Sequence, residues 1–168
     1  ISAYTNTTGD GIADQHNVLA SGFALDLSWL RGGDHTTNDL RVGIDSWIYV
    51  ACGDFGAQAT GCDGSEVELY GSGIIRMRMD GSDLKVFTEG TRNTYDFAVS
   101  HKLDLVALDN TNDGDGWDMR LHHLTPLAHM GFPHLYKYFS DDAAQSLADY
   151  GGGSGCDATH LQEPGFPD

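Results

Sequence analysis

Positively charged residues are scarce in this sequence. Its 168 residues include nine Lys and Arg against 25 Asp and Glu, which gives a formal net charge of −16. A chain of this charge repels nucleic-acid phosphates and anionic membrane surfaces. We therefore expect no nucleic-acid partner. The acidic excess suits calcium binding, secretion or a salty medium equally well, so it does not decide among them.

Long apolar runs and paired-cysteine motifs are also missing. No stretch approaches the roughly 20 apolar residues that a membrane helix needs, and no signal-peptide pattern opens the chain. Because it starts at Ile1, we interpret it as a processed or partial chain. The three cysteines form neither a C-x-x-C nor a C-x-x-C-H pattern, which excludes zinc-ribbon and c-type haem signatures. Cys62 and Cys156 lie in Gly-rich loops, where they either form a disulfide or stay free, and Cys52 is expected in a buried strand.

Proline is rare, with four residues, whereas glycine is abundant, with 22. Short apolar runs alternate with Asp-Gly and Asn-containing turns, a pattern typical of an all-β protein. Residues 141–150 are the one segment whose spacing suggests a short helix. We expect strands over residues 39–44, 47–52, 66–70, 73–79, 84–89, 95–99 and 103–108.

The chain also resembles itself. Residues 40–54 align without gaps on residues 95–109, an offset of 55, and both runs end in Asp. Repeats of roughly 40 to 55 residues built from short strands indicate β-propeller blades. We therefore predict a single domain over residues 1–168, a β-propeller segment of about three blades from a six-bladed ring. Since a blade cannot bury both faces alone, further segments or another chain would complete the ring. A single β-sandwich is the competing fold.

Two polar pairs precede the repeated strands. Asp34-His35 follows two glycines, and Arg92-Asn93 occupies the equivalent approach to the next repeat. A histidine can remove a hydroxyl proton while a neighbouring carboxylate fixes its tautomer. Arginine binds carboxylates in a fork, and asparagine both donates and accepts hydrogen bonds. The two pairs either converge on the central channel as a site or form solvated surface turns.

Oxygen-rich side chains are densest in residues 109–116. Asp109, Thr111 and Asp113 have the phase of the start of an EF-hand loop, but the twelfth position is Arg120 and no helices flank it. We reject an EF-hand and leave open a hard-cation site or an Asx-rich turn. Residues 6–14 form a weaker loop of this kind. The histidines that follow match no metal-binding spacing and are expected to be structural, with His129 ranked highest among His122, His123, His129 and His134.

Four blocks of the sequence carry a resemblance to a known superfamily. They are "DHTTNDLRVGIDSWIYVACGDFG", "GIIRMRMDGSDLKVFTEGTRNTYDFAV", "LDNTNDGDGWDMRLHHL" and "GFP". In order and spacing they resemble the quinoprotein glucose/sorbosone dehydrogenases, which are six-bladed β-propellers. The blocks, together with "LADYGGGSG", are most similar to large planctomycete-type proteins named membrane-bound dehydrogenases.

The resemblance implies roles for individual residues. His35, preceded by Asp34, matches the family's general base, which takes the sugar's hydroxyl proton while hydride passes to pyrroloquinoline quinone (PQQ). Arg92 and Asn93 match the pair that contacts the quinone. Its substrate would be a sugar or alcohol, its acceptor a redox partner such as a cytochrome, and its location periplasmic or extracellular.

The resemblance also implies a calcium ion beside the quinone. Asn110 and the backbone carbonyls of Thr111 and Asn112 fall at the Ca²⁺ position, with Asp109 and Asp113 as further candidate ligands. The family has Gly-Pro where this chain has Thr111-Asn112, which leaves the cation's geometry open. The family's remaining quinone contacts match no position before Asp168. Two other functions stay open because the fold does not decide among them: a non-catalytic binding or scaffold propeller, and a Ca²⁺-dependent sugar lactonase-like hydrolase.

Overall fold

Antiparallel sheets make up nearly all of the regular structure. The structure is a computed structural model that describes residues 1–24, 35–112 and 117–165. A four-residue helix, α2 (Leu135–Tyr138), and a 3₁₀ turn, η2 (Ser140–Asp142), lie between the last two strands. The strands are β1 (Ser2–Thr5), β2 (Gln15–Val18), β3 (Ala20–Ser21), β4 (Thr37–Val42), β5 (Trp47–Cys52), β6 (Ala57–Gly61), β7 (Glu66–Leu69), β8 (Ser72–Arg78), β9 (Lys85–Thr91), β10 (Phe97–Val99), β11 (Leu105–Asn112), β12 (Trp117–Leu124) and β13 (Ala148–Gly152).

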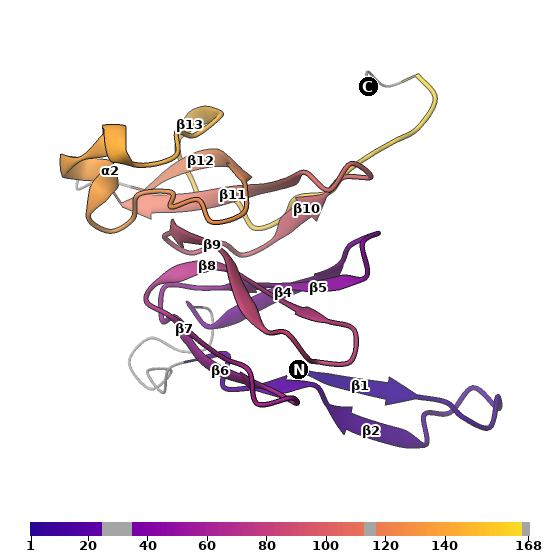
Figure 1. Cartoon of the computed structure of the whole chain (residues 1–168). Helices are drawn as coiled ribbons and strands as arrows, with labels where there is room; N and C mark the ends of the chain where they lie inside the picture. The colour runs from indigo at the N-terminus through magenta and orange to yellow at the C-terminus, as the bar shows by residue number, and fades with distance from the viewer. Residues whose placement is uncertain (25–34, 113–116, 166–168) are drawn as a thin grey trace.

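Two four-stranded sheets follow each other along the chain. Their strand orders are β4-β5-β8-β9 and β10-β11-β12-β13, and every neighbouring pair is antiparallel. The β6–β7 hairpin is inserted between β5 and β8 and pairs with β3, while β1 and β2 form a small sheet of their own. The sheets stack face to face in Figure 1, with β10–β13 at one end and β1–β2 at the other. The chain is therefore an all-β propeller segment, as the repeat predicted, and each of the two four-stranded sheets is a blade.

The internal repeat is real, but its offset is 57 and not 55. Val42 pairs with Ile48 beside the β4–β5 turn, as Val99 pairs with Leu105 beside the β10–β11 turn. The turn glycine Gly43 corresponds to Ser100 by the same hydrogen-bond pattern. An error of two residues survived the sequence comparison because side chains alternate faces with a period of two, so the shift keeps every apolar residue on its own face.

Strand β5 is buried on both faces, because each face packs on a different neighbour. Ile48, Val50 and Cys52 belong to one core, shared with the β3-β6-β7 sheet. The other face belongs to the inter-blade core between the two four-stranded sheets, formed by Trp47, Tyr49, Ala51, Ile74, Phe87, Phe97, Leu105, Ala107, Leu124 and Met130. A blade thus depends on its neighbours for burial of its apolar surface.

Polar contacts reinforce the seam between the blades. The Nη2 of Arg41 donates to both carboxylate oxygens of Asp96, each at 2.7 Å, and its Nε forms an ion pair with Asp39 at 2.9 Å. Burial and the neighbouring Asp96 carboxylate raise the pKa of Asp39 to about 6. Burial acts against ionisation of Asp96 as well, but hydrogen bonds with Asp39, Asp157 and Arg41 hold the pKa of Asp96 well below its ordinary value. The two carboxyls therefore ionise at different pH values.

Several sequence predictions need correction. The helix expected over residues 141–150 is wrong: that segment contains η2 and then β13, whose backbone pairs with the edge of β12. Strands β1, β2, β3, β6, β12 and β13 were not predicted. Of the two states left open for Cys62 and Cys156, the structure has both cysteines free, and the Cys62 Sγ donates to the Asp80 carbonyl. Among the described residues, no helix is long and apolar enough to cross a membrane.

Replacing Phe97 by Ala should destabilise the protein strongly. Its ring is fully buried in the inter-blade core, so we expect a loss of about 3–5 kcal/mol in the free energy of unfolding, measured with urea. Ile44→Ala is the control, because Ile44 is 73% exposed and should change stability by less than about 0.5 kcal/mol. Equal effects of the two changes would contradict this account of the seam.

Asp39→Asn should change how stability depends on pH. With its raised pKa, folded Asp39 binds a proton between pH 3.8 and about 6 that the unfolded chain has lost. The wild type therefore loses stability as the pH rises through this window, and the Asn variant lacks that loss. In urea unfolding across pH 4 to 7, the free energy of unfolding of the variant should rise relative to that of the wild type as the pH increases to about 6. A constant difference would contradict the prediction. Glu163→Gln, at an exposed carboxyl, is the control.

Candidate functional site

One end of the two blades gathers most of the predicted site residues. In an antiparallel meander, the start of the first strand and the end of the second lie at the same edge. His35 precedes β4, Asp54 follows β5, Arg92 follows β9, and Asn110 lies near the end of β11. A cavity of about 460 Å³ opens among them, which we call the His35 cavity; it is lined by His35, Arg92, Asn93, Tyr95, Asn110, Ser154 and Cys156.

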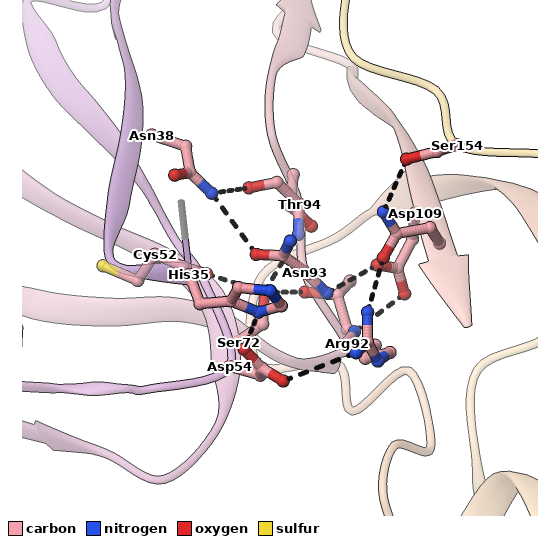
Figure 2. A network of polar contacts seen from close by, with 12 residues as sticks. His35, Asn38, Cys52, Asp54, Ser72, Arg92, Asn93, Thr94, Asp109 and Ser154 are labelled. Atoms are coloured by element: carbon pink, nitrogen blue, oxygen red, sulfur yellow. Dashed lines mark hydrogen bonds and ion pairs between the residues drawn. The ribbon is translucent and has the colours of Figure 1, made fainter. Parts of the chain in front are cut away.

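His35 forms a close pair with Asp54. Its Nδ1 lies 2.5 Å from the Asp54 Oδ1, and both side chains are largely buried, at 15% and 14% exposure. Figure 2 shows the pair beside Arg92. A carboxylate on Nδ1 holds the proton there and leaves Nε2 as the basic nitrogen. The partner expected from sequence, Asp34, lies outside the described residues; Asp54 was missed, although it is the acid that ends the first repeated run.

Gly53 allows this close approach. A Cβ at this position would lie 2.5 Å from the carbonyl carbon and oxygen of His35 and 2.6 Å from the Asn93 Oδ1. The segment that follows β5 is also hydrogen-bonded to His35, because the Phe55 N–H donates to the His35 carbonyl at 3.1 Å. The glycine therefore brings His35, Asp54 and Asn93 to one place.

Arg92 links the other polar groups of the cavity. Its Nη1 donates to the Asn110 Oδ1 at 2.8 Å, and its Nη2 lies 3.9 Å from the Asp54 Oδ2. The Asn110 amide in turn donates to Ser154 at 3.0 Å. The Asn93 Oδ1 accepts from Asn38 at 3.4 Å. Arg92 is 5% exposed and Asn93 3%, so both are held side chains and not the surface turn that was the alternative.

Asp109 holds the backbone of the Arg92-Asn93 pair. Its two oxygens accept the backbone N–H groups of Arg92 at 2.8 Å and Asn93 at 2.9 Å. The carboxyl is 1% exposed. Burial raises its pKa, although the two N–H groups favour the charged form. The Ser72 hydroxyl, at the start of β8, donates to the Cys52 carbonyl and accepts the Thr94 N–H at 3.2 Å. This contact anchors the segment that contains Arg92 and Asn93 to β8.

The predicted calcium ligands are only partly described. Thr111 and Asn112 end β11, opposite Asp118 and Trp117, and Asp113 lies outside the described residues. Among the residues that the structure describes, no group of three or more His, Cys, Asp and Glu could hold a metal ion. Asp109 already has a partner for each oxygen. The calcium site therefore stays a prediction.

The clustered histidines have separate surroundings. His123 lies 3.2 Å from the Asp104 carboxylate at the surface, and the His129 Nδ1 accepts the Gly131 N–H at 2.9 Å. His122 is buried, 3.8 Å from Asp109, and desolvation lowers the pKa of its imidazole. The alternation of apolar and polar residues over 117–121 indicates a strand, but it places His122 in phase with Asp118 and Arg120, so it does not predict that His122 is buried.

Comparison with known protein families identifies the family of this chain. A family model described as a domain of unknown function, DUF7133, matches residues 1–146. The chain belongs to the DUF7133 family. None of the curated proteins matches this sequence.

A solved propeller enzyme is similar to this DUF7133 chain. It is the PQQ-bound form of an aldose sugar dehydrogenase from Streptomyces coelicolor, with a TM-score of 0.52 and 24% sequence identity. The alignment covers 68% of this chain and 36% of that one. The likeness supports the propeller fold, and this chain spans about a third of the length of that enzyme.

Asp109→Asn should destabilise the protein. An amide can accept only one of the two backbone N–H groups, so a buried donor loses its acceptor, and we expect a loss of about 1–3 kcal/mol in unfolding free energy. Asp104→Asn is the matched control, because the Asp104 side chain is 51% exposed and its loss should cost less than about 0.5 kcal/mol. Urea unfolding measures both. A stable Asp109→Asn variant would contradict the assigned role.

Proposed function

We propose that this DUF7133 chain is part of a PQQ-dependent dehydrogenase that oxidises a sugar or alcohol. The observation that carries the proposal is the His35–Asp54 pair, whose histidine lines the same cavity as Arg92, Asn93 and Asn110. A base oriented by a carboxylate, next to an anion-binding arginine, suits the removal of a hydroxyl proton beside an acidic cofactor. Support from outside the chain is the similar fold of a sugar dehydrogenase solved with PQQ.

The residues of the His35 cavity fit a quinone that bears carboxylates. A guanidinium from Arg92 pairs with carboxylates, and the Asn93 and Asn110 amides match carboxylate and carbonyl oxygens. Because Gly53 has no Cβ, the His35 backbone and the Asn93 side chain pack closely against it, which keeps both residues at the cavity. When bound, PQQ supplies the two-electron acceptor for the hydride.

The chain's own residues then account for the proton. The substrate hydroxyl is oxidised to a carbonyl, so its carbon loses a hydride and its oxygen loses a proton. His35 accepts that proton at Nε2, and Asp54 stabilises the resulting imidazolium through Nδ1. Phe55, whose ring centroid lies 5.5 Å from that of His35, covers one side of the imidazole. Asp109 and Asn110 keep Arg92 in place throughout.

The finer parts of the proposal follow the resemblance. A Ca²⁺ ion would bind near Asn110 and the carbonyls of Thr111 and Asn112. The electrons would pass on to a redox partner such as a cytochrome, in the periplasm or outside the cell. We also propose that the protein is related to the planctomycete-type dehydrogenases, and that further segments or another chain complete the propeller ring.

Reconstitution of the natural protein that contains this chain tests the function. With PQQ and Ca²⁺ we expect saturable quinone binding, and reduction of a dye in the presence of aldoses or alcohols. Omitting Ca²⁺ tests the cation separately. Absence of quinone binding would overturn the proposal, and lactone hydrolysis that needs Ca²⁺ but no quinone would favour a hydrolase.

Two substitutions test the proposed base. His35→Ala should lower kcat by roughly 10² to 10⁴-fold while quinone binding persists, because the base is lost and Arg92 remains. Asp54→Asn, which no longer fixes the tautomer, should lower kcat by roughly 10²-fold or more. His123→Ala is the control, since His123 lies at the surface. Unchanged turnover in both site variants would contradict the assignment of His35 as the base.

A further inference from the structure

A second cavity lies beside β12, apart from the His35 cavity. Its volume is about 260 Å³, and its lining residues are all different from those of the His35 cavity. One wall is β12, with Arg120 and His122; the opposite wall comes from the connection to β13, with Ser140, Gln145 and Ser146. In Figure 1 this connection, which includes α2, lies beside β12 and β13. We call it the His122 cavity.

His122 is the feature of this cavity that needs explanation. Its side chain is 4% exposed, yet neither Nδ1 nor Nε2 has a hydrogen-bond partner in the protein. The nearest charged group is the Asp109 carboxylate, at 3.8 Å, which is beyond hydrogen-bond distance. Buried polar atoms are almost always satisfied, so an imidazole without partners at a cavity wall points to a polar ligand in that cavity.

The other lining groups narrow the chemistry of the ligand. Arg120 disfavours a cation, while Asp149 at the rim and the buried Asp109 behind His122 disfavour an anion. The net charge of the chain, −16, also disfavours an anionic ligand. Most lining side chains are polar, which disfavours an apolar ligand. A neutral molecule that both donates and accepts hydrogen bonds remains.

The wall opposite β12 is pre-organised to receive hydroxyl groups. The Gln145 Nε2 donates to the carbonyls of Ser140 at 2.7 Å and Ala143 at 3.2 Å, so the amide is held and its carbonyl oxygen is left as an acceptor. Asp149 is fixed by the Gly151 N–H at 2.9 Å and by Arg120 at 3.4 Å. Met130, Ala143 and Ala144 supply apolar surface for the carbon skeleton.

We propose that the His122 cavity binds a small neutral polyol, such as a monosaccharide. Each ligand hydroxyl can donate to one lining group and accept from another, as His122, Gln145, Arg120 and the serine hydroxyls together require. The site is independent of the His35 cavity and of any quinone, so it does not rest on the proposed function.

Binding of defined polyols to the quinone-free protein tests this proposal. The probes are D-glucose and myo-inositol, a cyclic polyol without an aldehyde carbon, with D-gluconate as the anionic counterpart of glucose. Ligand-observed NMR titration should give saturable binding of the neutral polyols with a Kd of roughly 1–10 mM, as expected for so small a ligand. Gluconate should bind more weakly than glucose.

Variants assign the binding to the cavity. Ser146→Leu, which fills the cavity from a partly exposed position, should weaken inositol binding by about 10-fold or more. Ser2→Leu, the same change on exposed β1, should leave it intact. His122→Phe removes both nitrogens at similar size and should also abolish binding, with thermal melting to confirm that it folds. His35→Ala should bind inositol like the wild type.

Three results would overturn the proposal. They are no saturable polyol binding up to about 100 mM, well above the expected Kd; binding that Ser146→Leu leaves unchanged; and binding that His35→Ala abolishes. The last would assign the polyol to the His35 cavity, whereas failure of quinone binding alone would affect only the proposed function.

Discussion

Burial of each blade's faces against its neighbours is the constraint on which the rest of this structure depends. The fully buried β5 lies between two cores, and neither of them exists within one sheet. Because Phe97 and Leu105 of the second blade must cover Trp47 and Tyr49 of the first, the two sheets stack in a fixed register. That register sets where the loops at their ends meet.

The polar residues at the site depend on this stacking in turn. Arg92 comes from the link between the blades, Asp54 from the first blade and Asp109 from the second, and their contacts join all three. Asp109 is the central member, since it binds two consecutive backbone N–H groups in a buried environment. A carboxylate there is costly to bury but fixes the direction of the Arg92 and Asn93 side chains. The cavity they line is therefore held by the same contacts that join the blades (Figure 2).

Each of the two cavities has a largely buried histidine near an aspartate, but the contacts differ. His35 is in hydrogen-bond contact with Asp54, 2.5 Å away, which fixes the orientation of its ring. His122 lies 3.8 Å from Asp109, whose oxygens are already bonded to backbone N–H groups. His122 lines the second cavity, and its two nitrogens have no hydrogen-bond partner in the protein. The same two residue types thus form a hydrogen bond in one cavity and none in the other, because the fold sets different distances between them.

Local sequence pattern determined the all-β class and the internal repeat. It also predicted the strands β4, β5 and β7 to β11 to within a few residues. These features are predictable because alternation and turn residues act over a few positions. Local pattern also identified His35, Arg92 and Asn93 as candidates, and the resemblance to the quinoprotein dehydrogenases added Asn110. It could not show that Asp54 is the partner of His35, 19 residues away, or that residues 148–152 pair with β12 instead of forming a helix. Those outcomes depend on contacts between segments distant in the chain, and only the stacking of the blades brings such segments together.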